Sequence, residues 1–259
     1  MNDPRLRVFV PAIVFAIAVL LVLPAAAHAQ VKVIISGGFA TAYQEVLPEF
    51  ERTTGIKITT GSGPSQGSGP NTIGGQLRRG VPTDVVILNR KGLDALIAEG
   101  LIAAETDVDL AQTVLGVSVR TGAPKPDISA VDAFKRTLLA AKTIAMPGST
   151  SGIYLTDELF PRLGIDKQVE VKVATRATEA AAMVARGEAG LVIQPVSELL
   201  HAPGIDFVGT IPAEIQHVSV FSAAVVANSK EQEAAKRLIA FLASEKTVAA
   251  IKKSGMEPK

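Results

Sequence analysis

The sequence of 259 residues carries 26 lysines and arginines against 25 aspartates and glutamates, and it contains no cysteine. This balance of charge argues against a nucleic-acid surface or a strongly acidic partner. The lack of cysteine excludes disulfides, thiol nucleophiles, thiolate metal sites and a lipid-modified N-terminus.

The first residues have the pattern of a secretory signal peptide. Two arginines precede an apolar run at residues 8–23, and a small-residue triplet at 27–29 follows. A basic start, an apolar middle and an A-x-A end predict cleavage between Ala29 and Gln30, with export to the periplasm. A retained membrane anchor is the alternative, because the apolar run is only slightly short for a span of about 20 residues.

Cleavage would remove Asp3, Arg5 and Arg7 from the totals and leave 24 basic and 24 acidic residues. The remaining histidines, His201 and His217, are too few for a zinc site of the usual composition, so we predict no metal and no other cofactor. We interpret both as surface residues. No other segment is long and apolar enough to span a bilayer, and we expect a soluble mature protein.

Strand and helix patterns alternate along the rest of the chain, which predicts an α/β fold built from right-handed βαβ units with mainly parallel sheets. The glycine-rich segment 61–70 interrupts the pattern, and we interpret it as a loop within one lobe rather than a linker. The predicted strands are residues 31–35, 56–60, 84–88, 114–119, 143–146, 169–173, 191–193 and 218–226. The predicted helices are residues 42–54, 73–79, 91–99, 131–139, 153–163, 177–186, 232–243 and 247–253.

Four loops that follow predicted strands are candidates for ligand binding. In open α/β sheets, ligands lie beyond the carboxyl ends of the strands, where helix N-termini present free N–H groups. Glycine allows close approach of the backbone, and hydroxyls can donate to an oxyanion, although both residue types also cap helices and form turns. The candidate residues in these loops are Ser36, Gly37, Gly38, Ser62, Gly63, Ser65, Asn89, Arg90, Ser149, Thr150, Ser151 and Gly152.

Two arginines are candidate ligand-binding residues. Arg120 ends an otherwise apolar strand, and its guanidinium could grip a carboxylate with two hydrogen bonds. The alternatives are a solvated strand end or an ion pair with Asp127. If Arg120 binds the ligand, Arg120→Ala should lose affinity and keep the melting point of the ligand-free protein. Arg90 is a second candidate of the same kind.

Enzyme motifs are weak, and we predict no catalytic residue. Residues 149–152 lack the lysine of a phosphate-binding loop, and residues 61–66 lack the last glycine of a dinucleotide fingerprint. Residues 63–67 match the letters G-x-S-x-G, but a serine nucleophile needs a tight strand-to-helix turn, and this match lies inside a long glycine-rich loop.

Several segments together resemble the periplasmic molybdate-binding proteins and other type 2 solute-binding proteins. They are QLRRGVPTDV at 76–85, TVLG at 113–116, SGIY at 151–154, LG at 163–164 and the ending at 241–255. The resemblance implies two lobes around a ligand cleft: residues 30–115, 116–220 and a return to the first lobe over 221–259. It also implies that the cleft closes on a small anionic solute, that the candidate loops contact it, and that an ABC-transporter permease recognises the protein, which we expect to be a monomer.

Departures from this family bear on the ligand. Gly38 stands where the family often has serine, Gln194 follows a strand where a tyrosine is expected, and Arg120 replaces an apolar residue. These changes fit small organic acids at least as well as molybdate or tungstate. Bacterial aconitate isomerase resembles the same fold, so an isomerase of small tricarboxylates is the alternative to a binding protein. A transcription-regulator effector domain is disfavoured, because a signal peptide stands where a DNA-binding helix pair should be.

Overall fold

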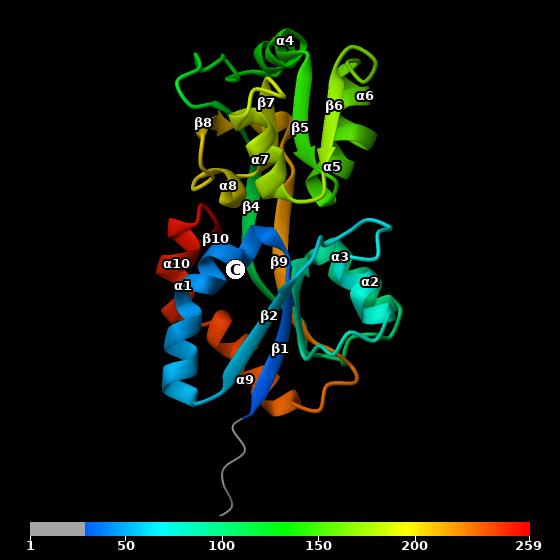
Figure 1. Cartoon of the computed structure of the whole chain (residues 1–259), viewed down its shortest axis with the longest axis vertical. Helices are drawn as coiled ribbons and strands as arrows, with labels where there is room; N and C mark the ends of the chain where they lie inside the picture. The colour runs from blue at the N-terminus through cyan, green and yellow to red at the C-terminus, as the bar shows by residue number, and fades with distance from the viewer. Residues whose placement is uncertain (1–28) are drawn as a thin grey trace, which may run out of the picture.

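The computed structural model describes residues 29–259, so residues 1–28 of the predicted signal peptide lie outside the description. Two lobes are stacked along the long axis of the molecule (Figure 1). They share one continuous path of strands, in the order β2-β1-β3-β9-β4-β7-β5-β6, with β8 and β10 added at β4. The prediction of a two-lobed α/β fold is confirmed.

The first lobe has a parallel sheet of β2, β1 and β3, to which β9 adds in the antiparallel direction. Side chains alternate across this sheet: Val33 and Ile35 face the core with α1, α9 and α10, whereas Ile34 faces the core with α2 and α3. The elements are β1 (Gln30–Ile35), α1 (Gly37–Thr54), β2 (Lys57–Ser62), α2 (Ile73–Arg78), β3 (Val85–Asn89), α3 (Arg90–Ala98), α9 (Gln232–Leu242), α10 (Val248–Lys253) and β10 (Glu257–Pro258).

The second lobe repeats this design around the parallel strands β6, β5 and β7. Leu191 and Ile193 of β7 face the core with α4, α5 and α6, whereas Val192 faces α7 and α8. The elements are α4 (Val131–Ala141), β5 (Thr143–Pro147), α5 (Thr150–Tyr154), a π-helical turn (Leu155–Leu159), α6 (Phe160–Leu163), β6 (Glu170–Ala174), α7 (Ala177–Ala185), β7 (Leu191–Pro195), α8 (Val196–Leu199) and β8 (Ile205–Thr210).

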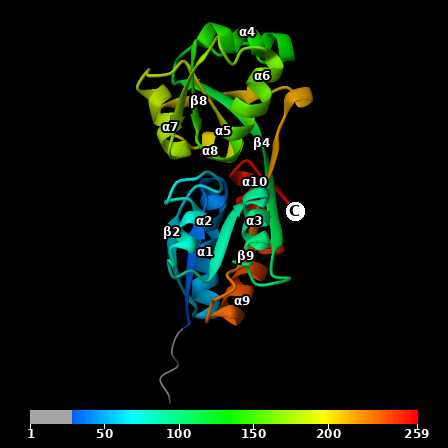
Figure 2. The ribbon, with the colours of Figure 1, turned by 90° about the vertical axis from the view of Figure 1, so that its right-hand side faces the viewer.

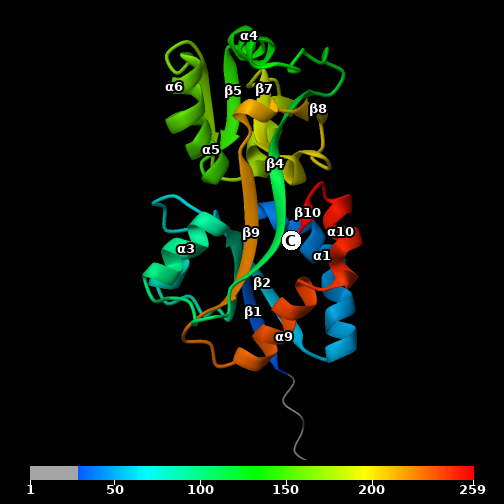
Figure 3. The ribbon, with the colours of Figure 1, turned by 180° about the vertical axis from the view of Figure 1, so that it is seen from behind.

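Two long strands join the lobes, β4 (Val108–Arg120) and β9 (Val218–Val225). They run side by side down one face of the molecule, which is toward the viewer in Figure 3 and on the right in Figure 2. β4 pairs with β9 as far as Val114 and with β7 from Leu115 onward, so its partner changes where the chain passes between the lobes. The boundaries predicted at 115/116 and 220/221 lie within these two strands, and the division of the chain at those points stays a prediction.

The predicted strands and helices are confirmed, with shifts at their ends. β4 begins six residues earlier than the strand predicted at 114–119. Its first half is extended because it pairs with β9, which is distant in the sequence, so the local pattern did not reveal it. β8 was not predicted, since residues 205–210 are half-buried and show little alternation. The single helix predicted at 153–163 is three short helical segments that begin at Thr150.

Candidate functional site

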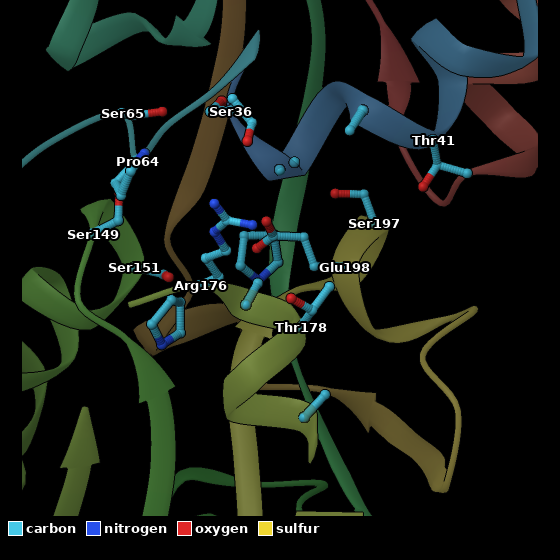
Figure 4. Close-up of a pocket in the computed structure, with 18 of the residues that line it drawn as sticks. Ser36, Thr41, Pro64, Ser65, Ser149, Ser151, Arg176, Thr178, Ser197 and Glu198 are labelled. Atoms are coloured by element: carbon cyan, nitrogen blue, oxygen red, sulfur yellow. The ribbon is translucent and has the colours of Figure 1, made fainter. Parts of the chain in front are cut away.

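A cavity of about 550 Å³ lies between the two lobes, within the range of small-molecule sites. Most of the predicted loop residues line it, and Figure 4 shows them converging from both lobes. This convergence follows from the fold, because the carboxyl ends of the parallel strands of each lobe point toward the other lobe. The predicted residues that line it are Ser36, Gly37, Gly38, Ser62, Gly63, Ser65, Asn89, Ser149, Thr150 and Ser151.

Three buried hydroxyls at the cavity have no hydrogen-bond partner among the described residues: Ser36 Oγ, Thr150 Oγ1 and Ser197 Oγ. Ser36 and Ser197 are only 3% and 4% exposed. An unpaired buried hydroxyl costs free energy, so a native protein retains it where another molecule satisfies it. Ser36 belongs to the first lobe and the other two to the second, so a ligand that pairs with all three would hold the lobes together.

The N-terminus of α1 opens into the cavity at Gly37. Ser36 is its N-cap residue, yet its side chain makes no capping hydrogen bond. The 18-residue helix carries a partial positive charge at this end, and its first N–H groups have no helical partners. Together with the free Ser36 hydroxyl, this end of α1 is suited to hold an anionic group.

Arg176 is a cavity residue that sequence reasoning missed. It is the N-cap residue of α7, and its exposed side chain reaches into the cavity (Figure 4). A guanidinium there can hold a carboxylate with two parallel hydrogen bonds. Arg176 follows the strand predicted at 169–173, so the strand-end rule could have found it.

Glu198 of α8 was also missed, and it lines the same cavity (Figure 4). Burial raises the pKa of its carboxyl from 4.5 to about 7. Its Oε1 packs so closely on the backbone of Gly37 that a Cβ at that position would overlap it. Glycine at 37 therefore lets a carboxyl of one lobe touch the helix N-terminus of the other.

The structure corrects the prediction for Arg90. Its guanidinium lies outside the cavity lining and is paired with Asp94 at 2.7 Å and Asp107 at 2.8 Å. Asp94 is one helical turn away, and Asp107 comes from the segment before β4. These carboxylates satisfy the arginine within its own lobe.

Arg120, Gly152 and Gln194 also lie outside the cavity lining. Arg120 is exposed at the end of β4 and pairs in register with Ile205, so the strand carries it to the outer part of the second lobe. Gln194 is fully buried, and its Nε2 donates to the backbone oxygen of Glu198 at 3.0 Å, which makes it a support for α8. A Cβ at Gly152 would overlap the carbonyl oxygen of Pro147, so this glycine lets α5 pack closely on the end of β5.

The glycine-rich loop reaches across the cleft. The backbone N–H of Gln66 donates to Ser149 Oγ of the second lobe at 3.4 Å. Ser65 Oγ accepts a hydrogen bond from the Asn89 N–H at 3.0 Å, so this serine braces the loop and does not have the exposed position of a nucleophile. The lobes therefore meet at this loop and at the Gly37–Glu198 contact, on either side of the cavity.

The two histidines differ in their surroundings. His201 is exposed, lines the cavity and lies with Nε2 3.3 Å from the carbonyl oxygen of Lys253. His217 is half-buried and stacks on the Tyr154 ring, with 4.6 Å between the ring centroids. Burial lowers the pKa of His217. The prediction of a surface residue is therefore wrong for His217, which is part of the packing beside the π-helical turn.

No group of three or more His, Cys, Asp or Glu side chains in residues 29–259 is arranged to hold a metal ion. In the same part of the chain, no helix combines the length and apolar character needed to cross a bilayer. The polar groups of the cavity are hydroxyls, a helix N-terminus, the amides of Gln44 and Asn89, one guanidinium, one carboxyl with a raised pKa and the imidazole of His201.

Comparison with known proteins identifies the family. Residues 31–257 match the bacterial extracellular solute-binding proteins. The chain belongs to this family. An aconitate isomerase of a Pseudomonas species is 44% identical over 227 residues, which is 87% of each chain.

Solved structures of more distant solute-binding proteins share the fold. The periplasmic molybdate-binding protein of Azotobacter vinelandii superposes with a TM-score of 0.67 at 20% identity, covering 87% of this chain and 98% of that one. The sulfate-binding protein SubI of Mycobacterium tuberculosis superposes with a TM-score of 0.69 at 19% identity, covering 89% and 87% of the two chains.

A glycine at position 38 has a packing reason in this solute-binding protein. A Cβ at Gly38 would overlap the ring of Phe221, a buried residue that lines the cavity. We expect Gly38→Ala to lower the free energy of unfolding by about 1–3 kcal/mol, because the ring must shift in a packed core. Denaturant unfolding measures this, with Gly69→Ala as control, since no atom lies within 4 Å of a Cβ there. Equal stability of both variants would contradict it.

Proposed function

We propose that this chain is an exported isomerase of small tricarboxylates that interconverts the cis and trans forms of aconitate. The observation that carries the proposal is the 44% identity to an aconitate isomerase over 87% of both chains. The structural relatives that bind inorganic oxyanions share 20% identity or less. The sequence alone favoured a binding protein over an isomerase, and the similarity to this relative makes the isomerase the preferred proposal.

The cavity supplies what such a reaction needs. Aconitate carries three carboxylates, and the N-terminus of α1 and Arg176 offer two separated positions for them. A proton shift between the two ends of the allylic system interconverts the isomers by moving the double bond. A base with a pKa near neutrality and positive groups that stabilise the carbanion would support that shift.

A second candidate function is binding without turnover, as the solute-binding component of an ABC importer. Family membership and the two-lobed fold favour it. The unpaired hydroxyls from both lobes would serve a ligand-driven closure recognised by a permease. In either function we keep the predictions of signal cleavage after Ala29, a periplasmic location and a monomer.

One pair of measurements on the protein starting at Gln30 separates the two functions. We expect conversion of cis-aconitate to the trans isomer, followed by proton NMR, and a rise in melting temperature with aconitate. A ligand at about 1,000 times its Kd stabilises by about 4 kcal/mol, or on the order of 10 °C here. A melting shift with an anion but no conversion would favour the binding protein. A shift with molybdate and tungstate alone would contradict the isomerase.

A further inference from the structure

Glu198 is the cavity group whose position the binding of an anion does not explain. Its carboxyl lines the cavity and packs on Gly37, at the positive end of α1, which also favours an anionic ligand. A second negative charge in an anion site weakens binding. A site evolved for affinity alone would therefore gain nothing from this side chain.

The carboxyl of Glu198 also has no partner among the described residues. In the described part of the chain it forms no ion pair and accepts no side-chain or backbone hydrogen bond within 3.5 Å, while its backbone is anchored by Gln194. Burial raises its pKa to about 7, so near neutral pH it exists in both the protonated and the ionised form. Such a group can both accept and return a proton under the same conditions.

Other titratable groups around the cavity are poor alternatives. Arg176 presents a guanidinium, which only donates hydrogen bonds. His201 follows α8 at the exposed edge, with Nε2 directed at the Lys253 carbonyl. Glu45 of α1 and Lys253 of α10 lie outside the cavity lining and pair with each other at 2.9 Å. Among the described residues that line the cavity, Glu198 is the half-buried titratable side chain, whereas Arg176 and His201 are exposed.

We propose that Glu198 is the catalytic base that carries the proton between the two carbons of the bound tricarboxylate. This inference rests on the proposed isomerase function. The Glu198 carboxylate removes a proton from the methylene carbon, and the electron pair of that C–H bond moves into the allylic system. The protonated carboxyl then delivers a proton to the former vinylic carbon, where a new C–H bond forms. The double bond has moved, and no oxidant or reductant is consumed.

The negative charge that develops during this shift spreads onto the substrate carboxylates. Arg176 and the N-terminus of α1 lie at the same cavity and would stabilise it there. Ser36 and Ser197 can donate their free hydroxyls to the same carboxylates. The base, the cation and the donors thus come from both lobes, so the complete site exists only when the lobes are closed.

The test compares Glu198→Gln with the wild-type chain and with Glu233→Gln, which makes the same chemical change at a side chain that is 85% exposed on α9. We expect Glu198→Gln to lower kcat for aconitate isomerisation by at least about 100-fold. Aconitate affinity, measured by calorimetry, should stay the same or increase, because one negative charge leaves the anion site. Glu233→Gln should match the wild type in both measurements.

The pH profile provides an independent readout. In the wild type, kcat should rise with pH through a pKa near 7 as the base ionises. Glu198→Asp keeps a carboxyl and should retain part of the activity with a shifted profile, which a purely structural role would not produce. Wild-type kcat in Glu198→Gln, or an unshifted profile in Glu198→Asp, would overturn the assignment and leave the isomerase intact. If the wild type binds aconitate without converting it, the proposed function fails and the base is overturned with it.

Discussion

Replacing Glu198 with glutamine is expected to stabilise the ligand-free protein at pH 8 and to leave its stability near pH 4.5 almost unchanged. In the folded chain, burial raises the pKa of this carboxyl from 4.5 to about 7. Between these two pH values the folded chain keeps a proton that the unfolded chain releases. The free energy of unfolding therefore falls as the pH rises through this window, and the full penalty is present above pH 7.

The size of this effect follows from the pKa difference. At about 1.4 kcal/mol per unit of pKa, the loss of unfolding free energy is at most about 3 kcal/mol. The actual loss is smaller, because the side chain is partly exposed to solvent. Glutamine carries no charge and pays no such penalty, so we expect its melting temperature at pH 8 to rise by several degrees. Thermal unfolding from pH 4.5 to 8 measures the difference. A constant difference between wild type and variant across this range would contradict the raised pKa.

Stability and the proposed activity are thus opposed at one side chain. The same burial that weakens the fold above pH 7 keeps Glu198 able to exchange protons near neutrality. The unpaired hydroxyls of Ser36, Thr150 and Ser197 add further cost in the ligand-free state. Such costs gathered around one cavity are typical of functional sites, where a protein gives up stability for chemistry.

Local sequence patterns predicted the loops of the site because their positions depend on the strands alone. Once Ser36, Ser62 and Ser149 are placed after parallel strands, the fold brings them to the facing edges of the two lobes. The strands themselves are visible as apolar runs, since both faces of each sheet are covered by helices.

The charged residues were harder to predict, because a charge in the sequence does not reveal its partner. Arg90 is held by Asp94 and by carboxylates from the start of β4, which only the folded chain brings near. Arg120 and Arg176 both stand near strand ends, but β4 runs away from the cavity at Arg120, whereas β6 ends at it before Arg176. The direction of each strand relative to the cleft decides which arginine reaches the cavity. That direction is known only once the sheet topology is known.

Removing the guanidinium of Arg176 is expected to weaken aconitate binding about 10- to 100-fold, with little change in the melting temperature of the ligand-free protein. A hydrogen-bonded pair between two charged groups contributes about 1.5–3 kcal/mol. Without ligand, the side chain is exposed and forms no ion pair with the described residues within 4.0 Å, so the fold loses little in Arg176→Ala. The backbone oxygen of Arg176, which accepts from Ala180, is retained.

Arg120→Ala is the matched control, because it removes the same charge from an exposed position in the same lobe, outside the cavity. Calorimetric titration of aconitate should give the wild-type Kd for Arg120→Ala and a weaker one for Arg176→Ala. Arg176→Lys should fall between, since an ammonium keeps the charge and lacks the planar fork that meets both oxygens of a carboxylate. Equal losses in the two alanine variants would mean that the overall field of the lobe attracts the anion. A loss in Arg120→Ala alone would place the ligand away from this cavity, and Arg176 would then have no part in binding it.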